Sequence, residues 1–167
     1  MDDQQLLITG ANGQLGLALQ EQYPKAIFTD KDTFDITSPS ALEVFDWAKV
    51  NVVINAAAYT NVDGSETPEG KELAWQVNHL AVRDLAKVAI ERDITLVHIS
   101  SDYVFDGTKT TPYTESDQPN PLSEYGKSKL AGDNEATKAP KNYLLRTSWV
   151  IGDGKNFVKT MLALGEK

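Results

Sequence analysis

A tyrosine and a lysine four residues apart, Tyr125 and Lys129, have the residue types and the spacing that a proton transfer requires. Residues at positions i and i+4 share one face of a helix. There a lysine ammonium would stabilise a phenolate and lower the pKa of Tyr125 from about 10 toward neutrality. The phenol could then donate or accept a proton. Because so short a spacing also occurs by chance on surface helices, the rest of the chain has to support this hypothesis.

A glycine-rich turn follows the first apolar run of the chain. Leu6–Thr9 is typical of a short strand, and Gly10, Gly13 and Gly16 come next, spaced G-x-x-G-x-x-G, before a helix-like run. Glycines at such a turn let the backbone approach a pyrophosphate, whose charge is met by amides at the helix N-terminus. The strand before and the helix after favour a dinucleotide site over a purely structural loop.

The end of the next predicted strand carries two opposite charges that bear on the cofactor. Asp30 follows Ala26–Thr29, about 20 residues beyond the glycines, where an acidic side chain can bond the adenosine ribose. Lys31 comes directly after it and could accept a 2′-phosphate. The pair therefore leaves NADPH and NADH open as cofactors, and a solvated strand end is the alternative explanation for both residues.

Two further strand ends carry small or polar residues. Val52–Ile54 leads to a run of alanines that ends at Ala58, and their bareness would let a flat cofactor lie against the backbone, although tight packing explains it too. Leu96–Ile99 leads to Ser101, whose hydroxyl can point at the site that Tyr125 would face. His98, inside that strand, is expected to be a packed core residue.

The strand and helix signals alternate along the whole chain, which predicts an α/β fold with a doubly wound parallel sheet, a Rossmann-like domain. We expect residues 1–167 to form one NAD(P)-binding domain that carries the catalytic residues. The apolar spacing from Lys71 to Arg92 predicts one long amphipathic helix. Asn78, beside the apolar stripe, would cap a kink; the alternative is that it supports the active site by holding a backbone group or a water. The proline-containing loop from Asp106 to Glu124 is expected to cross the mouth of the site.

Composition excludes several classes of function. The formal net charge of −8 argues against a nucleic-acid-binding surface, since phosphates require clustered Lys and Arg. With no cysteine there is no thiolate metal site and no cysteine nucleophile, and we expect no metal among the site residues. No apolar stretch reaches 18 residues, and the acidic N-terminus lacks the pattern of a signal peptide, so we expect a cytoplasmic protein without a membrane span.

Taken together, the motifs resemble the extended short-chain dehydrogenase/reductases and, among them, the dTDP-4-dehydrorhamnose reductases. The match runs end to end, and its most specific stretches are TGANGQLG at 9–16, SDYVFDG at 101–107 and YGKSKLAG at 125–132. The resemblance implies NAD(P)H-dependent reduction of the 4-keto group of dTDP-4-dehydro-L-rhamnose to give dTDP-L-rhamnose, a precursor of cell-surface polysaccharides.

By the same resemblance, Tyr125 donates a proton to the keto oxygen and Lys129 bonds the nicotinamide ribose. Ser101 stands where the family usually has threonine and would polarise the carbonyl. Asp102 and Trp149 match positions expected to contact the nucleotide-sugar substrate, together with Ser101 and Tyr125. The cofactor-binding residues implied besides Tyr125 and Lys129 are Gly10, Gly13, Gln14, Leu15, Gly16, Asp30, Lys31, Asp35, Ile36, Ala58, Tyr59 and Thr60.

The chain departs from the family pattern at its end. Chains of the family continue past the equivalent of Lys167 into a C-terminal region that holds much of the nucleotide-sugar site. We therefore expect a truncated chain that keeps the cofactor fold and turns over weakly, because the substrate is poorly held. A homodimer of the full-length protein stays open.

Two other functions remain as alternatives. One is a non-catalytic regulatory subunit, because the β subunit of methionine adenosyltransferase resembles this family too. The intact set of Ser101, Tyr125 and Lys129 favours an enzyme. The other is a nucleotide-sugar epimerase or dehydratase; dehydratases generally have an Asp-Glu pair after the active-site hydroxyl, whereas Asp102 is followed here by Tyr103.

Overall fold

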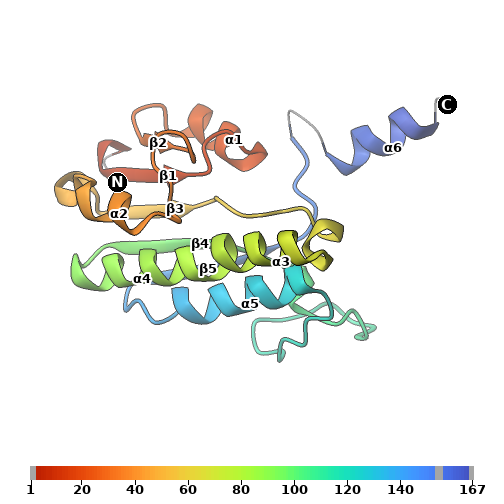
Figure 1. Cartoon of the computed structure of the whole chain (residues 1–167). Helices are drawn as coiled ribbons and strands as arrows, with labels where there is room; N and C mark the ends of the chain where they lie inside the picture. Colours follow the sequence, from red (N-terminus) through yellow and green to blue (C-terminus); the bar gives the residue numbers. More distant parts are fainter. Residues whose placement is uncertain (1–2, 153–155, 166–167) are drawn as a thin grey trace.

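The computed structural model of the chain describes residues 3–152 and 156–165. Its centre is a five-stranded, entirely parallel sheet in the order β2-β1-β3-β4-β5 (Figure 1). The strands are β1 (Leu6–Thr9), β2 (Ile27–Thr29), β3 (Val52–Asn55), β4 (Thr95–Ser101) and β5 (Asn142–Thr147). The predicted doubly wound parallel sheet is confirmed.

Six α-helices connect or flank these strands. They are α1 (Gln14–Gln22), α2 (Pro39–Val44), α3 (Pro68–Trp75), α4 (Ala81–Glu91), α5 (Glu124–Ala136) and α6 (Phe157–Gly165). None of the helices in the described part of the chain is long and apolar enough to cross a bilayer.

The sheet buries apolar side chains on both faces. Alternate residues of a strand point to opposite faces, so Leu7 of β1 packs with Leu85 of α4, while Leu6 and Ile8 pack with Leu19 of α1. Leu6, Leu7 and Ile8 are at most 1% exposed. Helices on both faces cover the central strands and leave the carboxyl ends of the strands to form a site.

The predicted long helix from 71 to 92 is interrupted. α3 and α4 are joined by one π-helical turn, Gln76–Leu80, and Asn78 lies within it, buried to 1% exposure. A π turn widens the helix locally and is frequent at functional sites. Asn78 therefore lies in a π turn that interrupts the helix, and its side chain has partners described below.

The short helix α2 begins with a cap and a proline. Ser38 caps it by accepting a hydrogen bond from the Ala41 amide at 3.3 Å, and Pro39 is its first residue. It ends at Val44, because the chain then extends through Phe45 so that the Trp47 ring reaches the core, where its indole donates to the Leu42 carbonyl at 2.8 Å.

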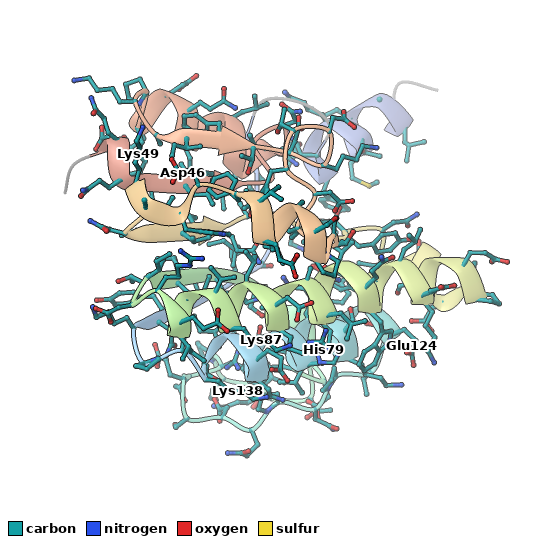
Figure 2. All side chains as sticks on the ribbon, turned by 60° about the vertical axis from the view of Figure 1, so that its left-hand side comes forward. Asp46, Lys49, His79, Lys87, Glu124 and Lys138 are labelled. Carbon is teal, nitrogen blue, oxygen red and sulfur yellow. The ribbon has the colours of Figure 1, made fainter. Side chains whose placement is uncertain are left out.

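The start of α5 is tied to α3. Ser123 caps α5 by accepting from the Gly126 amide at 3.0 Å, and the Glu124 carboxylate accepts from the Trp75 indole at 3.2 Å and pairs with Lys71 at 3.2 Å. Figure 2 shows Glu124 well separated from Lys138, which follows the other end of α5. These contacts fix the end of α5 that carries Tyr125.

The expectation that the loop of residues 106–124 crosses the mouth of the site is wrong. The Asp106 carboxylate instead accepts hydrogen bonds from the Thr108 amide, the Tyr113 hydroxyl and the Asn120 side chain, which fold the loop on itself. Figure 1 shows this teal segment beside the start of α5, and its residues 106–124 do not line the cavity.

Candidate functional site

A cavity of about 860 Å³ opens along the carboxyl ends of the strands. Every residue that sequence reasoning assigned to catalysis, cofactor or substrate lines it. These residues are Gly10, Gly13, Gln14, Leu15, Gly16, Asp30, Lys31, Asp35, Ile36, Ala58, Tyr59, Thr60, Ser101, Asp102, Tyr125, Lys129 and Trp149. Open α/β sheets bind their ligands at this edge.

The glycine turn brings backbone atoms of two strands' ends together. Gly10 has φ +72°, and a Cβ built there would lie 2.6 Å from the Ala57 amide nitrogen, so only glycine fits. Gly13 is the residue before α1 and provides no side-chain cap, which leaves the positive end of the helix dipole facing the cavity. Such an uncapped nine-residue helix is suited to an anion such as a pyrophosphate.

At the far end of the cavity Asp30 is held as a carboxylate. The amides of Asp32 and Thr33 donate to it at 3.0 and 3.1 Å, and the Asn12 side chain donates to its other oxygen. These hydrogen bonds, the Asp32 amide foremost, hold the pKa of Asp30 below its usual value. The link to Asn12 was missed from the sequence, because it joins two loops 18 residues apart.

Ser101 and Tyr125 meet near the middle of the cavity. Ser101 is the last residue of β4, and its hydroxyl accepts from the Tyr103 amide and donates to Asp102, each at 3.2 Å. Burial raises the pKa of Tyr125 above its usual value, and a hydrogen bond with Ser101 opposes this. The predicted net fall in the pKa of this phenol toward neutrality is therefore wrong in this structure, because the burial of the ring dominates.

Lys129 is 1% exposed and lies one helical turn from Tyr125. Its ammonium donates a hydrogen bond to the Ile99 carbonyl of β4 at 2.7 Å. Burial lowers the pKa of Lys129 to about 8, and the negative charge of Asp133 acts in the opposite direction. Lys129 thus lines the cavity, and its burial and the neighbouring Asp133 determine its protonation state.

Asn78 joins the alanine-rich segment to α5. Its side-chain oxygen accepts from the Tyr59 amide at 2.9 Å, and its amide nitrogen donates to the Tyr59 carbonyl and to the Ser128 hydroxyl, both at 3.1 Å. These two bonds to the backbone N–H and C=O of Tyr59 position the segment of Ala58–Thr60 against the cavity. The sequence showed a polar residue beside an apolar stripe but not its partners.

A buried row of polar side chains runs behind the site and was also missed. Thr9 donates to Asn55 at 2.7 Å, and Asn55 is 3.1 Å from His98 Nδ1. His98 Nε2 lies 3.8 Å from Asp133, which binds Arg146 at 3.3 Å. The prediction that His98 is a core residue holds, at 1% exposure. Asp133 lies four residues after Lys129, the one signal in the sequence that could have pointed to it.

Comparison with known proteins agrees with this geometry. Residues 4–167 match the family described as the RmlD substrate binding domain. The chain belongs to this family. It is 45% identical, over 96% of its length, to a dTDP-4-dehydrorhamnose reductase of Aggregatibacter actinomycetemcomitans and covers 57% of that relative. The family resemblance inferred from the motifs is therefore confirmed.

Solved structures of relatives share the fold closely. The structure of a dTDP-4-dehydrorhamnose reductase from Clostridium acetobutylicum superposes with a TM-score of 0.90 at 47% identity. One from Bacillus anthracis, solved in complex with NADP, superposes with a TM-score of 0.88 at 39% identity. In both cases the alignment covers 96% of this chain and 59% of the other. The chain thus spans little more than half the length of these relatives.

Proposed function

We propose that this chain is the cofactor-binding and catalytic part of a dTDP-4-dehydrorhamnose reductase that uses NADPH or NADH. The observation that carries the proposal is the cavity that brings the glycine turn, Ser101, Tyr125 and Lys129 together. The three relatives compared above, which are 39% to 47% identical to this chain, bear this name, and the structure of one of them is a complex with NADP.

The residues present fit a dinucleotide. A Cβ at Gly10 would meet Ala57, and the small side chains of Ala56–Ala58 keep the cavity open beside the turn. The uncapped N-terminus of α1 would meet the pyrophosphate, and Asp30 or Lys31 the adenosine ribose. The bound cofactor supplies a hydride.

The chain's own residues would supply the proton and the electrostatics. The Tyr125 hydroxyl donates its proton to the keto oxygen, which becomes the hydroxyl of the product while the tyrosine becomes a phenolate. Ser101 donates a hydrogen bond to the same oxygen as its negative charge develops. Lys129 stabilises the phenolate, whose formation the burial of the ring otherwise opposes.

Cofactor titration followed by turnover tests the proposal. We expect this chain to bind NADPH or NADH by fluorescence titration. In a version extended by the region that the relatives have in addition, Tyr125→Phe should lower kcat on the dTDP-4-keto sugar by about 10² to 10⁴-fold without weakening cofactor binding. Tyr143→Phe is the matched control, because Tyr143 is 63% exposed on β5 and does not line the cavity.

Two results would count against the proposal. If neither cofactor bound, the cavity would not be a dinucleotide site. If NADPH bound but the extended version reduced no dTDP-keto sugar, the regulatory-subunit alternative would be favoured instead. Turnover by Tyr125→Phe at the rate of the parent would remove the tyrosine from its proposed role.

A further inference from the structure

The interior behind Lys129 holds one carboxylate among several basic side chains. Asp133 is 1% exposed and lies one turn further along α5 than Lys129, on the side away from Tyr125. Because Lys129 makes its hydrogen bond to the neutral Ile99 carbonyl, any compensating negative charge has to come from another group. The buried polar side chains around Lys129 show that Asp133 is the group that supplies this charge.

Side chains alternate between the two faces of β4 and β5, and this alternation places His98, Ser100 and Arg146 on the face toward α5. His98 and Ser100 are buried on the side of the sheet that faces α5, and Arg146 pairs in register with Ser100. Arg146 approaches Asp133 from this side at 3.3 Å, and its guanidinium lies over the Phe105 ring, 5.3 Å from the centroid. The aspartate is therefore held on its outer side by a fixed cation.

The inner side of Asp133 faces a neutral histidine. Thr9 donates to the Asn55 oxygen, so the Asn55 amide nitrogen is left to donate to His98 Nδ1. The proton of neutral His98 is then on Nε2, which lies 3.8 Å from Asp133, too far for a hydrogen bond. Burial and the nearby Lys129 charge lower the pKa of His98 well below its usual value, so this imidazole carries no charge to compete with the lysine.

We propose that Asp133 is a positioning residue of the site, which acts through Lys129 by keeping the buried ammonium protonated. Arg146 holds its carboxylate at 3.3 Å, and the neutral His98 ring, which Asn55 orients, lies beside it at 3.8 Å. The inference rests on the proposed function only for its consequence, namely that a charged Lys129 can stabilise the phenolate of Tyr125. The charge of Lys129 itself can be measured without cofactor or substrate.

Ionisable groups from α5, β4, the turn after β4 and β5 surround the pair of Lys129 and Asp133. α5 contributes Tyr125, Lys129 and Asp133, β4 contributes His98, and the turn after β4 contributes Asp102 and Tyr103. β5 contributes Arg146. Burial raises the pKa of Asp133, while the Ser100 hydroxyl, Lys129 and Arg146 favour its charged form. Asp133 and Arg146 are thus charges of opposite sign that act on the same lysine.

This arrangement makes two substitutions act in opposite directions. Asp133→Asn removes the negative charge, and the midpoint of the Lys129 titration should fall by at least about one pH unit. Arg146→Gln removes a positive charge and leaves the aspartate unpaired, so the midpoint should rise. Arg146→Lys keeps the charge and should leave the midpoint near that of the parent. A merely structural ion pair would make Asp133→Asn and Arg146→Gln behave alike, since each breaks the same contact.

The experiment follows the ¹³Cε signals of lysine by NMR from pH 6 to 11 in this chain, with Lys129 assigned by the signal missing from Lys129→Met. The control is Asp84→Asn, which breaks the surface pair with Arg83 on α4 and should not move Lys129. Should Asp133→Asn not fold, Asp133→Ser takes its place in the same comparison with Arg146→Gln. Shifts of the same sign, or no shift in either variant, overturn the proposal. Failure to bind NADPH would contradict the proposed function without affecting this result.

Discussion

At the scale of single residues, Gly10 and Gly107 show two separate reasons for a glycine: a positive φ, and the lack of space for a Cβ. Both have a positive φ, +72° and +74°, but a Cβ would clash with Ala57 at Gly10 and meets nothing within 4 Å at Gly107. We expect Gly107→Ala to cost about 1 kcal/mol of the free energy of unfolding. Gly10→Ala should cost roughly 2 to 4 kcal/mol, because the backbone of Ala57 has to move as well.

Urea unfolding of the two glycine variants measures this difference, and NADPH titration adds a second readout. Gly10→Ala should weaken cofactor binding at least about tenfold, the effect of a misplacement worth 1.4 kcal/mol, whereas Gly107→Ala should leave it unchanged. An equal loss of stability in both variants would mean that conformational strain alone, and not the close approach of two chain segments, requires glycine at position 10.

At the scale of elements, the π turn between α3 and α4 depends on one side chain. Asn78→Ala removes the partners of the Tyr59 amide, the Tyr59 carbonyl and the Ser128 hydroxyl, all in or near the interior. Leaving buried polar groups unpaired costs about 1–3 kcal/mol each, so we expect a loss of roughly 2 to 4 kcal/mol after relaxation. Thermal unfolding by circular dichroism should show it. Asn51→Ala, which breaks only an exposed bond to Gln5, should cost well under half as much.

The junction of α3 and α5 gives a prediction about pH. Lys127, then Trp75 and Lys71, lower the pKa of Glu124 to about 2. A carboxyl group whose folded pKa is depressed stabilises the fold above its unfolded pKa, and this contribution is lost as the pH falls through the folded value. Glu124→Gln should therefore lower Tm by about 2 °C at pH 7, a partly screened effect. The difference from the parent should narrow toward pH 3, and a difference that grew on acidification would contradict it.

At the scale of the whole molecule, α6 stands apart from the other elements (Figure 1). Met161, Leu162 and Leu164 are 44%, 64% and 57% exposed, and the Trp149 ring, 4.3 Å from Phe157, is the main aromatic contact at its start. Deleting residues 158–167 should therefore change Tm by no more than about 2 °C, since little buried area is lost. It should also reduce light scattering on heating. A fall of 5 °C or more would show that α6 contributes to the stability of the sheet.

Local patterns allowed the fold and the lining of the cavity to be predicted. Three patterns depend only on neighbours in sequence: the glycine spacing, the Tyr125–Lys129 interval and the alternation of strands and helices. Because the carboxyl ends of parallel strands lie at the same edge of the sheet, the residues that follow them could be expected to line one cavity. The rise in the pKa of Tyr125, the path of the loop at 106–124 and the partners of Asp133 depend on burial and on residues far away in sequence. These are consequences of tertiary packing, which cannot be predicted from a short sequence pattern.

The strand order has a consequence for co-translational folding. β1 leaves the exit tunnel first, yet it lies in the interior of the sheet between β2 and β3 (Figure 1). Its Thr9 hydroxyl pairs with Asn55, 46 positions later. Until β3 emerges, the nascent chain displays an apolar strand with one unpaired edge, the kind of surface that recruits chaperones or templates aggregation. Pauses in translation before β3 has left the tunnel should therefore be harmful to folding, and later pauses should be tolerated.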